Sequence, residues 1–364
     1  MSTESIQANS AHRLIGLQYL RGMAALLVLL DHVGGMLALP RYVGRNPLPL
    51  LGYGAIGVDI FFTISGFIIV VACFEAQTLS PRVNVAQFLK QRFARIVPFL
   101  WVCVIAFAIV RWAGRGLFEW APYIRSLTLW PLGEVRPNVV WTLRHEALFY
   151  LTFAISMLWL RRPILLICWC ISPAILALTH LNTGELGAFL FNPVNLEFGA
   201  GAAAGWVYLM AWPCFQSFTR QTFLCTVALI FATLGLAATL KLGIRTVHFV
   251  FIVATMSIGL VFFSAFRCRD PRLLRVAGTL VGDASYSIYL THALIVLAAL
   301  ETLRRLAPGL NSLVLYGVLT LAGILGGVAI HLAVERPIVT KAQRALGLKN
   351  RSVAHHPARI PGRA

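Results

Sequence analysis

Long apolar stretches alternate with short polar connections along the whole chain. About ten of these stretches are long enough to cross roughly 30 Å of hydrocarbon as helices. Lipid offers no water to satisfy backbone N–H and C=O groups, so such stretches span a membrane as helices. The predicted spans cover residues 14–39, 56–76, 97–113, 139–160, 163–180, 194–212, 223–240, 247–266, 285–303 and 313–334.

This pattern predicts an all-α, polytopic membrane bundle of about ten helices. No polar block long enough to be a separate globular domain interrupts the apolar runs. We therefore expect one membrane domain over 14–337, a short tail over 1–13, and a basic tail without regular structure over 338–364. Glycine pairs four apart, Gly201 with Gly205 and Gly323 with Gly327, are typical of close helix packing.

Composition agrees with a membrane protein. Of the 364 residues, 59% are hydrophobic and 12% are charged, against roughly 45–50% and 25% in soluble domains. Lysine and arginine are more frequent in the connections on the side of the two termini, which predicts that both termini are cytoplasmic. That bias accounts for most of the net charge of +18, so the charge does not indicate nucleic-acid binding. The seven cysteines are scattered and predict neither disulfides nor a metal site.

Arg21 and His32 are the polar residues of the first span that most need a role. A charge at membrane depth is unfavourable and marks a functional site by default. The two residues are eleven positions apart, so on a helix they lie within about 20° of one face and ~16 Å apart along the axis. They are expected to line one wall of a polar interior.

Other spans add polar groups at similar depth. Asp59 and Ser65 lie in the second span, Glu146 in the fourth, His292 in the ninth, and Glu335 at the end of the tenth. A lone buried histidine is usually a satisfied core residue, but several ionisable groups in one bundle favour a shared polar cavity.

Arg92 and Arg95 lie in a basic segment between the second and third spans. Residues three apart project together from a helix, and guanidinium groups bind phosphate in bidentate fashion. A basic cytoplasmic loop is also what membrane orientation alone requires, so both interpretations stay open from the spacing alone.

Six motifs occur in an order that resembles the membrane acyltransferase-3 family. Together they extend from about Leu17 to Pro337, nearly the whole chain. The motifs are Arg21 and His32 with ten residues between them, the 57–66 block with Phe-Phe and Ser-Gly, Arg92-x-x-Arg95 before Pro98, Trp141-Thr-Leu with Glu146 and Phe149-Tyr150, the segment 285–292 ending in His292, and Glu335-Arg-Pro.

The resemblance implies an O-acyltransferase of a bacterial inner membrane. Its members move an acyl group, usually acetyl from acetyl-CoA, to a hydroxyl of a cell-surface or lipid-linked glycan such as exopolysaccharide. Acetyl-CoA is then a substrate, and no permanently bound cofactor or metal is expected. Membrane lipid, polysaccharide-assembly proteins and a second copy of the chain are the remaining expected partners.

Carried over residue by residue, the resemblance places chemistry on His32 and donor binding on Arg21, Arg92 and Arg95. Glu146 is a second catalytic candidate because a carboxylate can orient a histidine. The adjacent Asp31 could do the same. The residues expected to line the site are Asp31, Asp59, Ser65, His292 and Glu335.

Two mechanisms fit this assignment. His32 could deprotonate the acceptor hydroxyl for direct attack on the thioester, or it could carry the acyl group as a covalent intermediate. Two other classes of protein also place polar groups at membrane depth. A transporter or exporter of a polar or glycolipid substrate is the main alternative, and a non-catalytic scaffold of polysaccharide assembly is the third.

Overall fold

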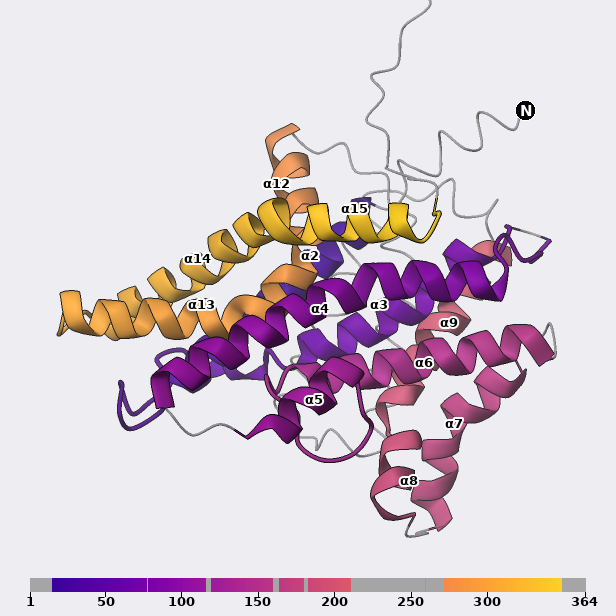
Figure 1. Cartoon of the computed structure of the whole chain (residues 1–364), viewed down its shortest axis with the longest axis horizontal. Coiled ribbons are helices and arrows are strands. Elements are labelled where there is room, and N and C mark those ends of the chain that lie inside the picture. The colour runs from indigo at the N-terminus through magenta and orange to yellow at the C-terminus, as the bar shows by residue number, and fades with distance from the viewer. Residues whose placement is uncertain are drawn as a thin grey trace, which may run out of the picture.

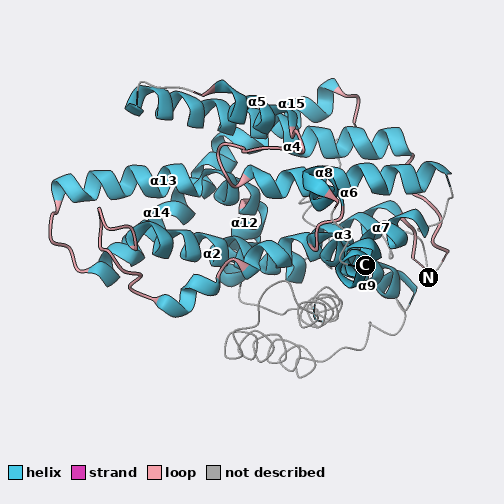
Figure 2. Ribbon diagram, turned by 90° about the horizontal axis from the view of Figure 1, so that it is seen from below, coloured by secondary structure: helices cyan, strands magenta, loops and turns pink. Residues whose placement is uncertain are grey.

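The computed structural model describes residues 15–76, 78–115, 119–159, 164–179, 183–210, 259 and 272–348. Those residues form helices and no named strand, which confirms the all-α prediction. The predicted tail over 1–13 and the predicted spans over 223–240 and 247–266 lie outside the described residues, apart from residue 259. Figure 1 labels the elements along the chain, and Figure 2 shows the bundle from below.

The helices follow one another with short connections. In chain order they are α2 (Ile15–Leu37), the short turn η2 (Pro49–Tyr53), α3 (Ile56–Cys73), α4 (Val85–Arg115), α5 (Trp120–Thr128), α6 (Val140–Trp159), α7 (Ile164–Thr179), α8 (Gly184–Leu190), α9 (Val194–Met210), α12 (Arg272–Asp283), α13 (Ser285–Leu306), α14 (Ser312–Ile330), the π-helical turn η4 (His331–Glu335) and α15 (Arg336–Ala345).

Every predicted span that falls in the described residues coincides with a helix. By length and composition, five helical segments among those residues can cross a membrane: Gly16–Leu37, Pro49–Cys73, Val85–Ala113, Ser285–Leu306 and Ser312–Ala345. Helices α6, α7 and α9 match further predicted spans but are not among these five. Helices α7 and α9 have only 16 and 17 residues, and α6 is less apolar because it carries Arg144, His145 and Glu146. The count of ten spans and the cytoplasmic termini stay predictions.

The basic segment before the third predicted span is not a loop. It forms the first turns of α4, which runs without interruption from Val85 to Arg115 and contains Pro98. Proline removes one backbone donor, but membrane helices tolerate it where local adjustments satisfy the freed carbonyl. Arg92 and Arg95 therefore project from the same rigid helix that continues as the span.

The tail without regular structure was predicted to begin at residue 338, but helical structure continues to Ala345. Residues 338–345 belong to α15, an ordered helix that starts directly after η4 and packs along α4. The expectation of no regular structure came from its many charges. Val339 is nonetheless buried, because a helix can bury one apolar side while its charges stay on the other.

Glycine allows the helices of the bundle to approach closely. A Cβ on Gly66 or Gly201 would collide with the backbone of the facing helix in the α3–α9 pair, and Gly205 faces Val70 of α3. Gly323 lies against Leu29 and Gly327 against Ile288. The predicted packing seams are therefore confirmed on both sides of the bundle.

Helix α2 connects the two apolar cores of the bundle. One core gathers around α3, α4, α6 and α9 and includes Leu17 and Leu20 from the first turns of α2. The other gathers around α13 and α14, which lie side by side in Figure 1, and includes Leu29 and Val33 from its later turns. Polar residues on α2 thus lie where the two halves meet.

Candidate functional site

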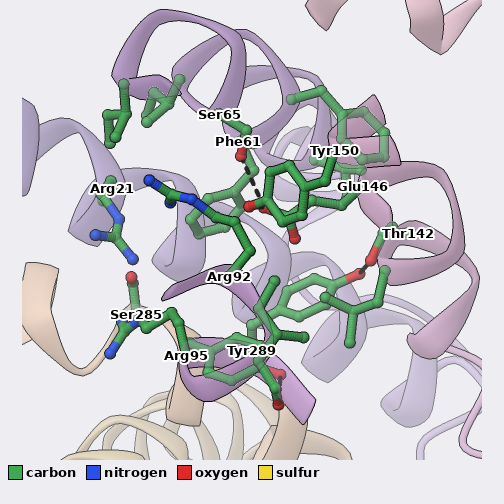
Figure 3. A pocket seen from close by; sticks show the side chains of 17 residues that line it. Arg21, Phe61, Ser65, Arg92, Arg95, Thr142, Glu146, Tyr150, Ser285 and Tyr289 are labelled. Atoms are coloured by element: carbon green, nitrogen blue, oxygen red, sulfur yellow. Dashed lines mark hydrogen bonds between the residues drawn. The ribbon is translucent and has the colours of Figure 1, made fainter. Parts of the chain in front are cut away.

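A cavity of about 140 Å³ lies between α2, α3, α4, α6 and α13. Figure 3 shows arginine side chains on one side of the view and Glu146, Tyr150 and Thr142 on the other. Most of the remaining wall is aliphatic or aromatic. The lining residues are Arg21, Val58, Phe61, Phe62, Ile64, Ser65, Ile68, Arg92, Arg95, Ile96, Thr142, Leu143, Glu146, Tyr150, Ser285, Tyr286 and Tyr289.

Arg95 is held from behind the cavity by a buried carboxylate. Its guanidinium lies 2.9 Å from Glu335, whose side chain is fully buried. The second oxygen of Glu335 accepts hydrogen bonds from Ser287 at 2.6 Å and from the His331 ring at 2.8 Å. Glu335 was predicted to line the site, but it is not among the residues that line the cavity. It fixes the position and balances the charge of Arg95.

Arg21 and Arg92 have no such compensation. Within the described part of the chain, no carboxylate forms an ion pair with either guanidinium. The Arg92 guanidinium lies 5.5 Å and 5.6 Å from the ring centroids of Phe88 and Tyr150. Aromatic faces stabilise a cation but do not neutralise it. Two partly buried positive charges that face one cavity have the chemistry to bind an anion with several oxygens.

Glu146 has its own partners across the cavity. Its carboxylate accepts hydrogen bonds from Ser65 on α3, at 3.0 Å, and from Tyr150 one turn further along α6. These bonds place Glu146 in the wall opposite the arginines. They do not place it as the partner of His32.

The His32 ring is oriented by its own helix. Nδ1 lies 2.8 Å from the backbone carbonyl oxygen of Val28, and because a carbonyl only accepts, Nδ1 carries the hydrogen. In the neutral ring Nε2 is then unprotonated and can accept a proton. The backbone carbonyl of Val28 therefore fixes the tautomer of His32. This is the role expected of a carboxylate of Asp31 or Glu146.

His292 lies against His32 in the same tautomer. Its Nδ1 donates to the carbonyl oxygens of Tyr289 at 2.7 Å and Ile288 at 3.1 Å. The two imidazole rings are 4.7 Å apart between centroids and meet edge to face at 70°. His292 is fully buried, so it packs beside His32 and does not line the arginine cavity.

Successive ring contacts connect His32 to the arginine cavity through His292 and Tyr289. Tyr289 lines the cavity, and its ring centroid is 6.2 Å from that of His292 and 5.9 Å from that of Phe61. The Tyr289 hydroxyl hydrogen-bonds Thr142 at 2.9 Å. His32 itself lines a second, more open hollow of about 350 Å³.

This second hollow lies at the end of α2 and the loop that follows it. Its wall contains the Asp31 carboxylate, the His32 imidazole and the Asn46 amide. The lining residues are Asp31, His32, Gly34, Gly35, Met36, Ala38, Leu39 and Asn46. The first span therefore carries two distinct binding surfaces, one at Arg21 and one at His32.

Among the remaining expected residues, Ser65 lines the arginine cavity and Asp59 does not. Asp59 lies instead beside Glu197 of α9, a fully buried carboxyl group that the sequence analysis missed. The signal was available, since Glu197 is an acidic residue inside a predicted apolar span. Tyr289 and Thr142 were also missed, because an aromatic and a hydroxyl side chain are common in membrane helices.

Fold and site together define a membrane-embedded helical protein with an arginine-lined cavity and with an oriented histidine on the helix that carries Arg21. The acyltransferase-domain family matches residues 14–332, nearly the whole chain. The protein therefore belongs to the acyltransferase-3 family, and it is a membrane acyltransferase.

Two relatives extend this assignment. The chain is similar to "Exopolysaccharide production protein ExoZ" of Rhizobium meliloti (strain 1021), with 31% identity over 307 residues, which cover 80% of this chain and 91% of that protein. It is also similar to "Acyltransferase MdmB" of Streptomyces mycarofaciens, with 30% identity over 172 residues, or 43% of each chain. No solved structure matches the chain.

Proposed function

We propose that this protein transfers an acetyl group from acetyl-CoA to a hydroxyl of a cell-surface or lipid-linked glycan, such as an exopolysaccharide, at a bacterial inner membrane. One observation carries the proposal. Helix α2 presents Arg21, which forms no ion pair with the other described residues, to the arginine cavity, and it presents the oriented ring of His32 to a more open hollow. The relative with 91% of its length covered is named for exopolysaccharide production, which supports a glycan acceptor.

The arginine cavity suits the anionic part of the donor. CoA carries phosphate groups, and guanidinium groups bind phosphate oxygens through charge-assisted hydrogen bonds. Among the described residues no carboxylate forms an ion pair with Arg21 or Arg92, whereas Arg95 is already held by Glu335 at 2.9 Å. Arg95 then acts as a fixed cation that adds to the positive potential of the cavity.

His32 suits the acceptor step. Its unprotonated Nε2 takes the proton of an acceptor hydroxyl while the hydroxyl oxygen bonds to the thioester carbonyl carbon. The C–S bond then breaks, and the CoA thiolate leaves and takes up the proton from His32. In the alternative route Nε2 attacks the thioester first, the C–S bond breaks and the CoA thiolate leaves. The acetyl-imidazolium then passes its acetyl group to the hydroxyl oxygen, the hydroxyl proton neutralises the thiolate, and the neutral His32 ring is restored.

The spacing of the two residues fits a donor that reaches from one surface to the other. Eleven residues of helix correspond to ~16 Å, which is comparable to an extended pantetheine arm. With the N-terminus in the cytoplasm, as the distribution of basic residues predicts, CoA enters from the cytoplasmic side and the acceptor from the outer side. The thioester then passes Tyr289 and Phe61 to reach His32.

Purified protein in lipid nanodiscs, incubated with radiolabelled acetyl-CoA and de-O-acetylated exopolysaccharide, tests the proposal. We expect label on the polysaccharide, or transiently on His32. In proteoliposomes, uptake of glycan or acetyl-CoA without label transfer would instead identify a transporter. Neither transfer nor uptake would leave a scaffold role and contradict the proposal.

A further inference from the structure

The hollow at His32 has the chemistry of a sugar site. Its wall offers a carboxylate, an amide and an imidazole, together with apolar surface from Met36, Ala38 and Leu39. Carboxylates accept hydrogen bonds from hydroxyl groups, and amides both donate and accept them. No lysine or arginine is among the described residues that line it.

Two of these polar groups are free to bind a ligand. The Asn46 side chain packs on Gly34, and its carbonyl oxygen accepts from the backbone N–H of Leu48 at 3.0 Å. Its NH₂ group therefore remains available in a fixed place. Among the described residues, no ion pair or side-chain hydrogen bond engages the Asp31 carboxylate.

The floor of the hollow is kept open by Gly35. A Cβ at Gly35 would meet no atom within 4 Å, whereas a Cβ at the adjacent Gly34 would collide with Asn46. Gly34 is therefore needed for packing, and Gly35 is not. Gly35 is exposed and lines the hollow together with His32, and residues three apart project to the same side of a helix.

We propose that this hollow is the acceptor subsite and that it binds an uncharged pyranose, with Asp31 and Asn46 on the sugar hydroxyls and the reacting hydroxyl at Nε2 of His32. The proposal rests on the acyltransferase function proposed above and assigns its acceptor class. An anionic sugar, such as a uronate, would bring a second negative charge next to Asp31 with no cation in the lining to offset it.

The first experiment fills the hollow without disturbing the bundle. Gly35→Leu is compared with Gly317→Leu, because Gly317 also has no atom within 4 Å of its Cβ and lies exposed on α14. With labelled acetyl-CoA and de-O-acetylated exopolysaccharide, we expect Gly35→Leu to lose at least tenfold in transfer rate while its Kd for CoA stays within twofold of wild type. Gly317→Leu should match wild type in both.

Failure of the two proposals can be told apart in this experiment. If wild type and Gly35→Leu transfer acetyl equally well, the acceptor subsite is elsewhere and the acyltransferase function stands. If wild-type protein transfers no label, the proposed function fails and the subsite fails with it. Weaker CoA binding by Gly35→Leu would assign the hollow to the donor and overturn the proposal.

The second experiment tests the class of sugar. Dodecyl β-glucuronide has a carboxylate in place of the 6-CH₂OH group of dodecyl β-glucoside, and dodecyl β-xyloside is uncharged but also lacks the 6-hydroxyl. We expect wild type to label both uncharged glycosides at least tenfold faster than the glucuronide. Asp31→Asn should lower the ratio of glucoside to glucuronide labelling by raising kcat/KM for the glucuronide. Asn46→Ala should raise KM for the glucoside. Equal labelling, preference for the glucuronide or labelling of none would overturn the assignment to uncharged pyranosides.

Discussion

The arginine cavity and the His32 hollow are built on the same helix, yet they differ in charge and in enclosure. The cavity lies inside the bundle and gathers Arg21, Arg92 and Arg95 around aromatic walls. The hollow opens at the end of α2, and the described residues that line it include one carboxylate and no lysine or arginine. The Tyr289–His292 contact lies between them. A single helix can thus serve two ligands of different chemistry at its two ends.

The three arginines of the cavity differ in how their charges are balanced. Arg95 is compensated by Glu335 at 2.9 Å, while Arg21 and Arg92 are left without a carboxylate partner among the described residues. Unpaired cations at membrane depth are unfavourable unless they bind a ligand or reach water. Arg95 is therefore held by the ion pair that supports the cavity wall, whereas the charges of Arg21 and Arg92 can be balanced by a ligand or by water.

The largest expected effect comes from His32→Ala, which separates the two surfaces functionally. We expect acetyl transfer to fall by about 10²–10⁴-fold, the usual contribution of a general base, and to a similar or greater degree if His32 carries the acetyl group. CoA affinity should not change, because His32 does not line the arginine cavity. Initial rates with labelled acetyl-CoA and calorimetry with CoA measure the two quantities.

A transfer rate close to wild type in His32→Ala would show that His32 takes no part in the chemical step. Loss of CoA binding in the same variant would instead show that the arginine cavity and the His32 hollow form one site.

The next largest effect is expected for Arg92→Met, which removes a cation from the cavity while keeping a long side chain. Hydrogen bonds to charged groups contribute ~1.5–3 kcal/mol, so CoA should bind about ten- to a hundredfold more weakly, and less so at high salt. Lys90→Met is the matched control, since Lys90 lies exposed on the same helix. Equal weakening by both variants would indicate a general charge effect.

Glu335→Ala tests the compensated arginine and should mainly affect stability. Removing one partner of a buried ion pair is destabilising, and because the Arg95 side chain keeps 33% exposure we expect only about 1–3 kcal/mol, with a higher KM for acetyl-CoA. Thermal unfolding in nanodiscs and steady-state kinetics measure both effects. Glu335→Gln should recover part of the loss through its hydrogen bonds to Ser287 and His331.

Glu301→Gln is the control for this variant, because Glu301 pairs with Arg304 at 3.5 Å where both side chains are exposed. Exposed pairs contribute about 0–1 kcal/mol. A KM for acetyl-CoA that is unchanged in Glu335→Ala would show that the position of Arg95 does not matter for the donor.

The smallest effect is expected for Tyr42→Phe, outside both surfaces. The Tyr42 hydroxyl donates to Glu301 at 2.7 Å, and its loss should lower stability by ~0.5–1.5 kcal/mol without changing transfer or CoA binding. The pKa of Tyr42 is raised by partial burial and by this bond to Glu301. A marked loss of transfer in this variant would extend the functional region to the loop after α2.

Local patterns in the sequence predicted the positions of the helices well, and they predicted less well where charged helices begin and how they pack. The apolar runs located α2, α3, α13 and α14, and the glycine pairs located their seams. Charge density was a poor guide in two places. It predicted a loop where α4 begins and a tail without regular structure where α15 packs, because charge alone does not show which side of a helix faces the bundle.

The candidate site was predictable as a set of residues and not as an arrangement. Arg21, Arg92, Arg95, Ser65 and Glu146 do line one cavity. Their pairing could not be read from spacing, since Glu146 bonds Ser65 on another helix and Asp59 lies beside Glu197 of α9.

The sequence by itself determined an all-helical membrane protein of the acyltransferase-3 family, because hydrophobic period, helix length and motif order are properties of neighbouring residues. It also determined that Arg21 and His32 share a helix face. Only the tertiary structure decided that Arg95 is compensated and Arg92 is not, and that His32 faces a hollow separate from the cavity. Those outcomes depend on which helices pack together, and a side chain's charge is balanced by its neighbours in space.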